Sequence, residues 1–437
     1  NLKDAIPVLL EKSNALVHDS WRAEAEIKAS RDHEVDYERG ERSSEREKKF
    51  LHWYRVYRYL IEKFVHIQPT GNTELGSQPL KELLAFADRL IDLYVASDFI
   101  NYELYPVNVN ISRDYIVSTN DEENDIASME REYGDEQAKL NLGIIGNKND
   151  TADSSISVSD YLDELDLGFK KDFGFGLKNF VNVQQVLTLW AVNAKKEDRT
   201  HYYATAKEMA SVCSEKINGY DASETDSILN FLTLKPEEIL VIKGDVRPAE
   251  DVPVWEHNKR LARFDIKPLI KIGDQYCWGP HSMDRATHIW VNISSKHRLP
   301  SDLNAPTVKA SLKKGHEDLE NSLVEKIKEI ALRHTSNVKR DVYPHKHDES
   351  VSDIGDCDVL AYLKDKNILL NIESKIIDPP HSNKDAGRMQ RKLFGEAKED
   401  GTFKKGYLQR VEEREKYLKA KGKDLMTKIG WETSTAD

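Results

Sequence analysis

The sequence predicts a multidomain protein with a mainly α N-terminal region and an α/β C-terminal domain, in which a mixed central sheet is flanked by helices. Three observations carry this prediction. Apolar residues recur every three or four positions through much of the N-terminal half, which is typical of amphipathic helices. In the last quarter, one expected helix is followed by three short apolar runs and a helical tail. The length of 437 residues allows two to four domains.

Residues 1–104 are expected to form a helical bundle or hairpin. A first helix covers residues 1–30, and the charge-rich stretch at 31–44 is expected to be a loop. The clearest helical pattern runs over 45–68. A second amphipathic helix has Pro79 in its first turn, where proline is favoured. Two long helices joined by a short loop predict antiparallel packing.

Aromatic residues and arginines alternate at 53–59, as in proteins that stack single-stranded bases. Helical spacing places Trp53, Tyr57 and Phe64 on one side, so core packing is the favoured interpretation.

The middle of the chain divides into three regions. Residues 105–157 are rich in Asn, Asp, Ser and Gly and predict a polar, partly disordered linker, with some helix at 126–140. Residues 158–250 are expected to be a mostly helical module. Residues 251–305 are expected to form a β-containing connecting segment. Its strands are expected at 264–270 and 276–280, with a turn between them.

Residues 306–437 are expected to form the last domain. An amphipathic helix follows Gly315, and an extended run covers 337–343. Two apolar runs come next, separated by the polar turn 364–367, and a helical tail extends over 386–421. This order of elements predicts the mixed sheet.

Composition limits the classes of function. Charged residues make up 32% of the chain and the mean hydropathy is -0.64, and no apolar run approaches the ~20 residues that span a bilayer. No secretory signal pattern is visible at the first residues, and Cys213, Cys277 and Cys357 are too far apart for a disulfide framework or a zinc knuckle. These features predict a cytoplasmic protein that does not associate with membranes.

The net charge of -12 argues against indiscriminate nucleic-acid binding over the whole surface. The charge is uneven, however, because residues 376–431 contain 14 Lys and Arg against nine Asp and Glu. A basic tail suits a phosphodiester substrate, although a solvated charged helix would have the same composition.

The chemistry of the chain is concentrated in the two apolar runs. Asp358 opens the first run, and Glu373 and Lys375 close the second. A hairpin closing at 364–367 brings Asp358 beside the Glu-x-Lys end, and strand alternation puts Glu373 and Lys375 on one face. Carboxylates suit Mg²⁺, and a lysine beside them could orient or help deprotonate a metal-bound water and add positive charge near a phosphate. The alternative is a surface hairpin with salt-bridged ends.

This arrangement resembles the PD-(D/E)xK nuclease superfamily, also called restriction-endonuclease-like, over about the last quarter of the chain. Gly315 followed by Glu320 is similar to the Gly-x-x-x-Glu helix of the Mrr-like branch. The Pro of the Pro-Asp pair is absent, since Cys357 precedes Asp358. The resemblance implies Asp358, Glu373 and Glu320 as metal ligands, which act in catalysis together with Lys375. It also implies Mg²⁺ as cofactor, with Mn²⁺ able to substitute.

The resemblance further implies that the helices after Lys375 meet the nucleic-acid backbone. The residues expected to bind it are Lys384, Arg388, Gln390, Arg391, Lys392, Gln409 and Arg410. The predicted function is a metal-dependent endonuclease acting on DNA, in restriction or phage defence. The alternatives are an inactive nuclease-fold scaffold and an RNA or single-strand nuclease.

Two further predictions concern partners. Cutting both strands requires two active sites, which predicts a homo-oligomer, and the N-terminal helical region is a candidate surface for a protein partner. His345 and His347 could suggest a metal pair, but no second pair stands at zinc-finger spacing, so a polar loop is favoured.

Overall fold

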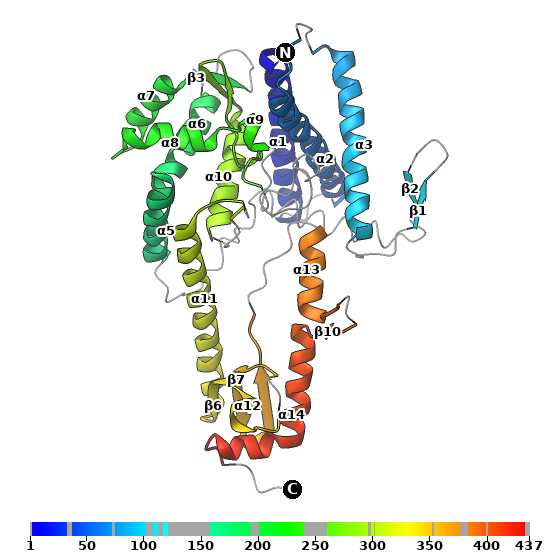
Figure 1. Ribbon diagram of the computed structural model, residues 1–437, viewed down its shortest axis with the longest axis vertical. Helices are drawn as coiled ribbons and strands as arrows, with labels where there is room; N and C mark the ends of the chain where they lie inside the picture. The colour runs from blue at the N-terminus through cyan, green and yellow to red at the C-terminus, as the bar shows by residue number, and fades with distance from the viewer. Residues whose placement is uncertain are drawn as a thin grey trace. The chain divides into compact units, whose positions relative to one another are not determined.

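The computed structural model consists mostly of helices, with four small antiparallel sheets among the described residues (Figure 1). The described residues are 2–32, 37–71, 75–101, 108–111, 117–120, 158–193, 201–239, 260–295, 299–300, 302–351, 354–375, 383–398 and 401–432. The chain divides into two compact units. Unit 1 combines residues 1–148 with 162–312, and unit 2 contains residues 149–161 and 313–437.

Unit 1 begins with three long helices: α1 (Leu2–Asp32), α2 (Tyr37–Ile67) and α3 (Ser77–Asn101). The expected helices are therefore confirmed, but the loop expected at 31–44 is wrong for its described part. Glu, Arg and Lys are good helix formers, so a run of charge does not by itself interrupt a helix. The helices are followed by a hairpin of β1 (Asn108–Ile111) and β2 (Val117–Asn120). The helix expected at 126–140 lies outside the described residues.

The middle of unit 1 is mostly helical, as predicted. It contains most of α5 (Val158–Phe173), followed by α6 (Leu177–Asn193), β3 (Tyr202–Thr205), α7 (Ala206–Lys216), α8 (Thr225–Leu232) and α9 (Pro236–Ile239). Helix α7 starts with a complete capping box, in which Glu208 N donates to the Thr205 hydroxyl and Thr205 N donates to Glu208. Strand β3 was not predicted.

The connecting segment contains a short hairpin of β4 (Ile270–Ile272) and β5 (Gln275–Trp278), and β3 pairs with the other edge of β5. The strand predicted over 264–270 is wrong for most of its length. The backbone turns there instead, because Ile266 N and Lys267 N both donate to Arg263 O. Helix α10 (Pro280–Ser295) follows β5 and was not predicted.

Apolar packing joins the described residues of unit 1 in two places. One core joins α1, α2 and α3 to α9 and the β4–β5 hairpin, and in it Tyr57, Leu60 and Ile61 are buried, with Trp53 and Phe64 packed against them. The interpretation of 53–59 as a core-packing face is therefore confirmed. The other core is aromatic and brings Phe169, Phe180 and Trp290 into edge-to-face contact from three different helices.

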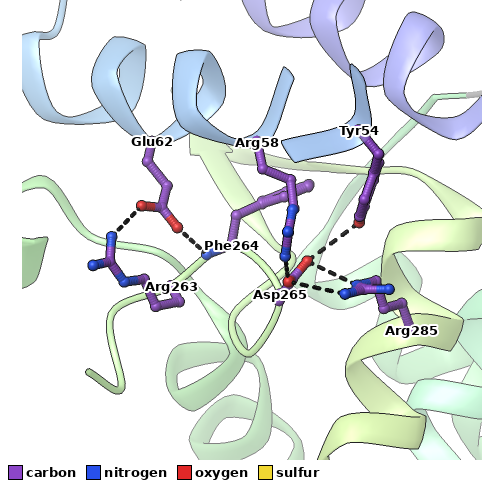
Figure 2. A network of polar contacts seen from close by, with 7 residues as sticks. All are labelled: Tyr54, Arg58, Glu62, Arg263, Phe264, Asp265 and Arg285. Atoms are coloured by element: carbon purple, nitrogen blue, oxygen red, sulfur yellow. Dashed lines mark hydrogen bonds and ion pairs between the residues drawn. The ribbon is translucent and has the colours of Figure 1, made fainter. Parts of the chain in front are cut away.

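A buried ionic network also links α2 to α10 (Figure 2). Asp265 accepts hydrogen bonds from Tyr54 Oη at 3.2 Å and Arg285 Nε at 3.1 Å, and it forms an ion pair with Arg58. Burial, together with the positive charge of Arg285, lowers the pKa of Arg58 to about 9. Tyr54 and Arg58 lie about 200 positions before Asp265 in the chain. Regions that the sequence suggested as separate domains therefore pack as one unit.

Unit 2 is built on a three-stranded sheet with the order β6 (Val338–Val342), β7 (Cys357–Leu363) and β8 (Ile368–Ile372). Both strand pairs are antiparallel, so the prediction of a mixed sheet is wrong for the described strands. A parallel neighbour needs a crossover of a dozen or more residues, whereas the four-residue turn between β7 and β8 only allows a hairpin. Asn367 closes that turn with a φ of 52°, which asparagine tolerates.

Helices complete unit 2. Helix α11 (Pro306–Leu332) begins before Gly315, so that glycine lies inside the helix, and the boundary between the two units falls within α11. The short α12 (Pro344–His347) contains His345 and His347. The single helical tail predicted over 386–421 is instead α13 (Asn383–Phe394), a hairpin of β9 (Glu396–Ala397) and β10 (Phe403–Lys404), and α14 (Tyr407–Lys428).

The core of unit 2 places Val342, Cys357 and Leu360 against Leu425 of α14, with Trp431 packed on the outside. All three cysteines of the chain are free and buried. No helix among the described residues is both long and apolar enough to cross a membrane.

Candidate active site

The β7–β8 hairpin places Asp358 opposite Glu373. Val359 pairs with Ile372, so the next step of the same antiparallel register sets Asp358 and Glu373 side by side. Directly opposite residues of an antiparallel pair project to the same face of the sheet. Strand β7 is buried along nearly all its length, which holds the Asp358 backbone in place. The convergence expected from the sequence is therefore what the structure contains.

Lys375 connects the two carboxylates. Its Nζ lies 3.1 Å from Glu373 Oε1 and 3.5 Å from Asp358 Oδ2. Asp358 Oδ2 also accepts a hydrogen bond of 2.6 Å from Ser374 N, so the backbone of the Glu-x-Lys segment fixes the orientation of the carboxylate. The described contacts of Asp358 all use Oδ2.

Arg414 of α14 is the fourth charged member of the cluster. Its guanidinium is buried and forms an ion pair with Glu373 Oε2, while Nη1 donates to Ile354 O at 3.0 Å. The side chain passes Gly355, where an added Cβ would lie 2.6 Å from Arg414 Nη1 and the φ of 82° also favours glycine. Gly355 is therefore needed for Arg414 to reach Glu373.

The electrostatics favour a protonated lysine. Burial lowers the pKa of Lys375, but Glu373 and Asp358 outweigh it, so the pKa is raised above its ordinary value. The pKa of Glu373 is raised by burial, and Arg414 and Lys375 oppose that rise. With the contacts seen here, Lys375 acts at neutral pH as a cation, and the role of proton acceptor considered from the sequence would require it to leave these carboxylates.

Two more carboxylates lie near the cluster. Asp356, Asp341 and Asp358 all raise the pKa of Tyr343, and the charge of Asp356 is the largest cause. Asp356 also forms a hydrogen bond with Tyr343.

Glu320 is not joined to this cluster by any described contact. It lies on α11, where His316 Nε2 is 3.8 Å from its Oε1. Across the described residues, no group of three or more His, Cys, Asp or Glu side chains is arranged to hold a metal ion. The role of Glu320 as a metal ligand stays a prediction. Asp358 and Glu373 alone still fit Mg²⁺, because that ion is usually held by one or two carboxylates together with water and substrate phosphates.

The predicted nucleic-acid contacts divide into two groups. Arg388, Arg391 and Lys392 of α13 and Arg410 of α14 line one pocket of about 470 Å³. Gln390 is exposed on α13 outside this lining, and Lys384 lies in the first turn of α13, where its side chain is outside the described set. Gln409 Oε1 accepts a hydrogen bond of 2.7 Å from Gly406 N, so this side chain helps to begin α14.

The sequence did not single out Arg414 or Tyr407. Arg414 stood among many charged residues of the helical tail, and only the buried position distinguishes it. Tyr407 lies at the start of α14, with Lys375 Nζ 5.9 Å and Lys392 Nζ 5.3 Å from its ring centroid. The Tyr407 ring thus lies beside both the carboxylate cluster and the basic pocket. The only sequence signal for it is an aromatic residue within a basic segment.

Comparison with known proteins gives no relative for this chain: no family model, no curated protein and no solved structure matches it.

Proposed function

We propose that unit 2 is a metal-dependent endonuclease that hydrolyses phosphodiester bonds, with DNA as its substrate and Asp358, Glu373 and Lys375 as its catalytic residues. The observation that carries the proposal is the position of Lys375 Nζ, which contacts Asp358 in β7 and Glu373 directly after β8. A surface hairpin with ordinary salt bridges would not bury Asp358 or direct a buried arginine onto Glu373.

The residues would divide the work as follows. Asp358 and Glu373 would hold Mg²⁺ or Mn²⁺, which when bound polarises a phosphoryl oxygen and lowers the pKa of a water ligand. Arg414 keeps Glu373 ionised and oriented. Lys375 provides a positive charge for the phosphate as negative charge develops on it. The pocket around Arg410 would bind the flanking backbone through contacts that do not depend on sequence.

The test is cleavage by the purified full chain. Plasmid, linear duplex, single-stranded DNA and RNA are each incubated with Mg²⁺, Mn²⁺ or EDTA. Lys375→Ala is expected to lower the rate at least about 100-fold, by analogy with the loss of one preorganised donor to a developing charge. Lys364→Ala is the matched control, because Lys364 lies in the turn of the same hairpin and pairs only with exposed Glu432 in the described contacts.

Three outcomes separate the alternatives. Metal-dependent cleavage that Lys375→Ala abolishes and Lys364→Ala retains supports the proposal. Cleavage of RNA or single-stranded DNA alone supports the alternative of an RNA or single-strand nuclease. Absence of cleavage with every substrate and metal, from protein whose fold is intact by circular dichroism, refutes the enzymatic function and leaves a binding protein.

A further inference from the structure

We infer that the basic pocket between α13 and α14 is a phosphate-binding subsite for the strand being cut, with Tyr407 as the residue that connects it to the catalytic cluster. The inference rests on the proposed function for its substrate. It adds Lys404, Lys405 and Tyr407 to the site, none of which was expected from the sequence.

The pocket has the size and charge of an anion site. Its volume of about 470 Å³ lies within the range of roughly 300–1,000 Å³ that small ligands occupy. Among the described residues, six Lys and Arg side chains line it together with one carboxylate, Glu396. That carboxylate lies 3.3 Å from Arg391 Nε and 3.4 Å from Lys404 Nζ, and Lys405 Nζ lies 2.5 Å from Glu413 Oε1 on α14, so two carboxylates contact three of the six cations and the lining keeps an excess of positive charge. Phosphate oxygens are the natural partners of such a lining.

The backbone around the pocket is closely packed. Helix α13 ends where Gly395 N donates to Arg391 O, and Gly395 has a φ of 83°. A Cβ at Gly406, just before α14, would lie 2.3 Å from Gly395 N. The end of α13 therefore meets the start of α14 at two glycines, and the β9–β10 hairpin pairs Lys404 with Glu396 across the opening. The backbone that carries these cations is thus closely packed, while the Lys404 and Lys405 side chains reach solvent.

Tyr407 gives the pocket its relation to the catalytic cluster. Lys375, which contacts both carboxylates, and Lys392, which lines the pocket, each lie within 6 Å of the same ring. A phosphate bound in the pocket therefore lies near the scissile position, on a neighbouring nucleotide. A free nucleotide offers the same phosphate chemistry, and the experiment has to distinguish the two.

Binding is measured separately from cleavage. The full chain is titrated in EDTA into a fluorescent single-stranded oligonucleotide, and anisotropy is followed over a series of salt concentrations. For Lys404→Gln/Lys405→Gln we expect at least 10-fold weaker binding and a salt slope that is smaller by about 1.4, since each phosphate contact on a single strand contributes ~0.7. The matched control is Lys416→Gln/Lys419→Gln, which removes the same charge from exposed positions of α14 outside this pocket.

The subsite is refuted if the pocket variant binds within twofold of the unchanged protein with the same salt slope. If a deoxynucleoside monophosphate competes as strongly as the oligonucleotide does, the assignment of the pocket to a strand is overturned. These measurements contain no metal. Weaker binding by the pocket variant therefore supports the subsite even where no cleavage is ever observed. Metal-dependent cleavage with unaltered binding by the pocket variant would refute the subsite alone.

The role of Tyr407 has its own signature. Tyr407→Leu is expected to lower kcat as well as binding, because it releases both lysines, whereas Lys404→Gln/Lys405→Gln raises KM. Tyr407→Phe retains the ring and is expected to restore both quantities. Equal losses in Tyr407→Phe and Tyr407→Leu would overturn the part assigned to the ring.

Discussion

The pairing of Arg414 with Glu373 gives the sharpest test of how unit 2 is held together. Arg414→Met removes the guanidinium from a position that is 2% exposed and leaves the Glu373 carboxylate without its buried partner. Breaking a buried ion pair from one side costs ~3–5 kcal/mol. Because the Glu373 side chain is still 18% exposed and also contacts Lys375, we expect the lower end, about 3 kcal/mol.

The loss can be measured in the full chain with 5-fluorotryptophan. Trp431 is the only tryptophan of unit 2, and it packs on the core formed by Val342, Cys357, Leu360 and Leu425. Its fluorine resonance, assigned with Trp431→Phe, reports urea unfolding of this unit. A slope of ~2 kcal/mol per molar urea converts 3 kcal/mol into a midpoint lower by about 1.5 M.

Two comparisons show whether charge is the cause. Lys419→Met removes an exposed cation that pairs with Glu415 on the same helix, and it is expected to cost less than about 0.5 kcal/mol. Glu373→Gln combined with Arg414→Met is expected to recover about 1 kcal/mol or more, since no unpaired carboxylate remains. A midpoint for Arg414→Met equal to that of Lys419→Met would refute the reasoning.

Two further predictions concern unit 1. Asp265→Asn leaves Arg58 and Arg285 without their shared counter-ion and is expected to lower the free energy of unfolding by about 3–5 kcal/mol. The fluorine resonance of Trp290 should then be lost at a lower urea concentration. Asp274→Asn, at an exposed position, is the control, and equal stability of the two variants would contradict the role of the network. Burial and neighbouring His18 lower the pKa of His281 to about 4, so the unfolded chain takes up this proton first and stability falls as the pH drops from about 6.5 towards 4. His281→Gln is expected to remove up to about 2 kcal/mol of the loss between pH 7 and pH 5. His288→Gln should have the opposite effect, a larger loss of stability between pH 7 and pH 5, because a hydrogen bond with Asp284 raises the pKa of His288. Both variants are compared by thermal unfolding at these two pH values. The same pH response in both would contradict the assignment.

Helix α10 shows why part of the fold could not be predicted. Its first backbone N–H groups, those of His281 and Ser282, donate to Asn14 Oδ1 on α1 at 3.0 and 3.1 Å. This cap is supplied from a residue more than 260 positions away, so the local sequence does not reveal it. The same limit explains the failed strand at 264–270, where Asp265 is buried by Tyr54, Arg58 and Arg285 and not by strand pairing.

The sequence by itself determined the long helices and the β7–β8 hairpin with its Asp358, Glu373 and Lys375, because these depend on periodicity and on a turn of four residues. Partners that are close in the chain need little loop closure to meet, so local patterns identify them. Only the tertiary structure decided that Arg414 crosses Gly355 to reach Glu373, and that α13 and α14 meet at two glycines to form a basic pocket. These contacts join residues 11 to 60 positions apart, where no local pattern specifies which of many equivalent charges becomes buried.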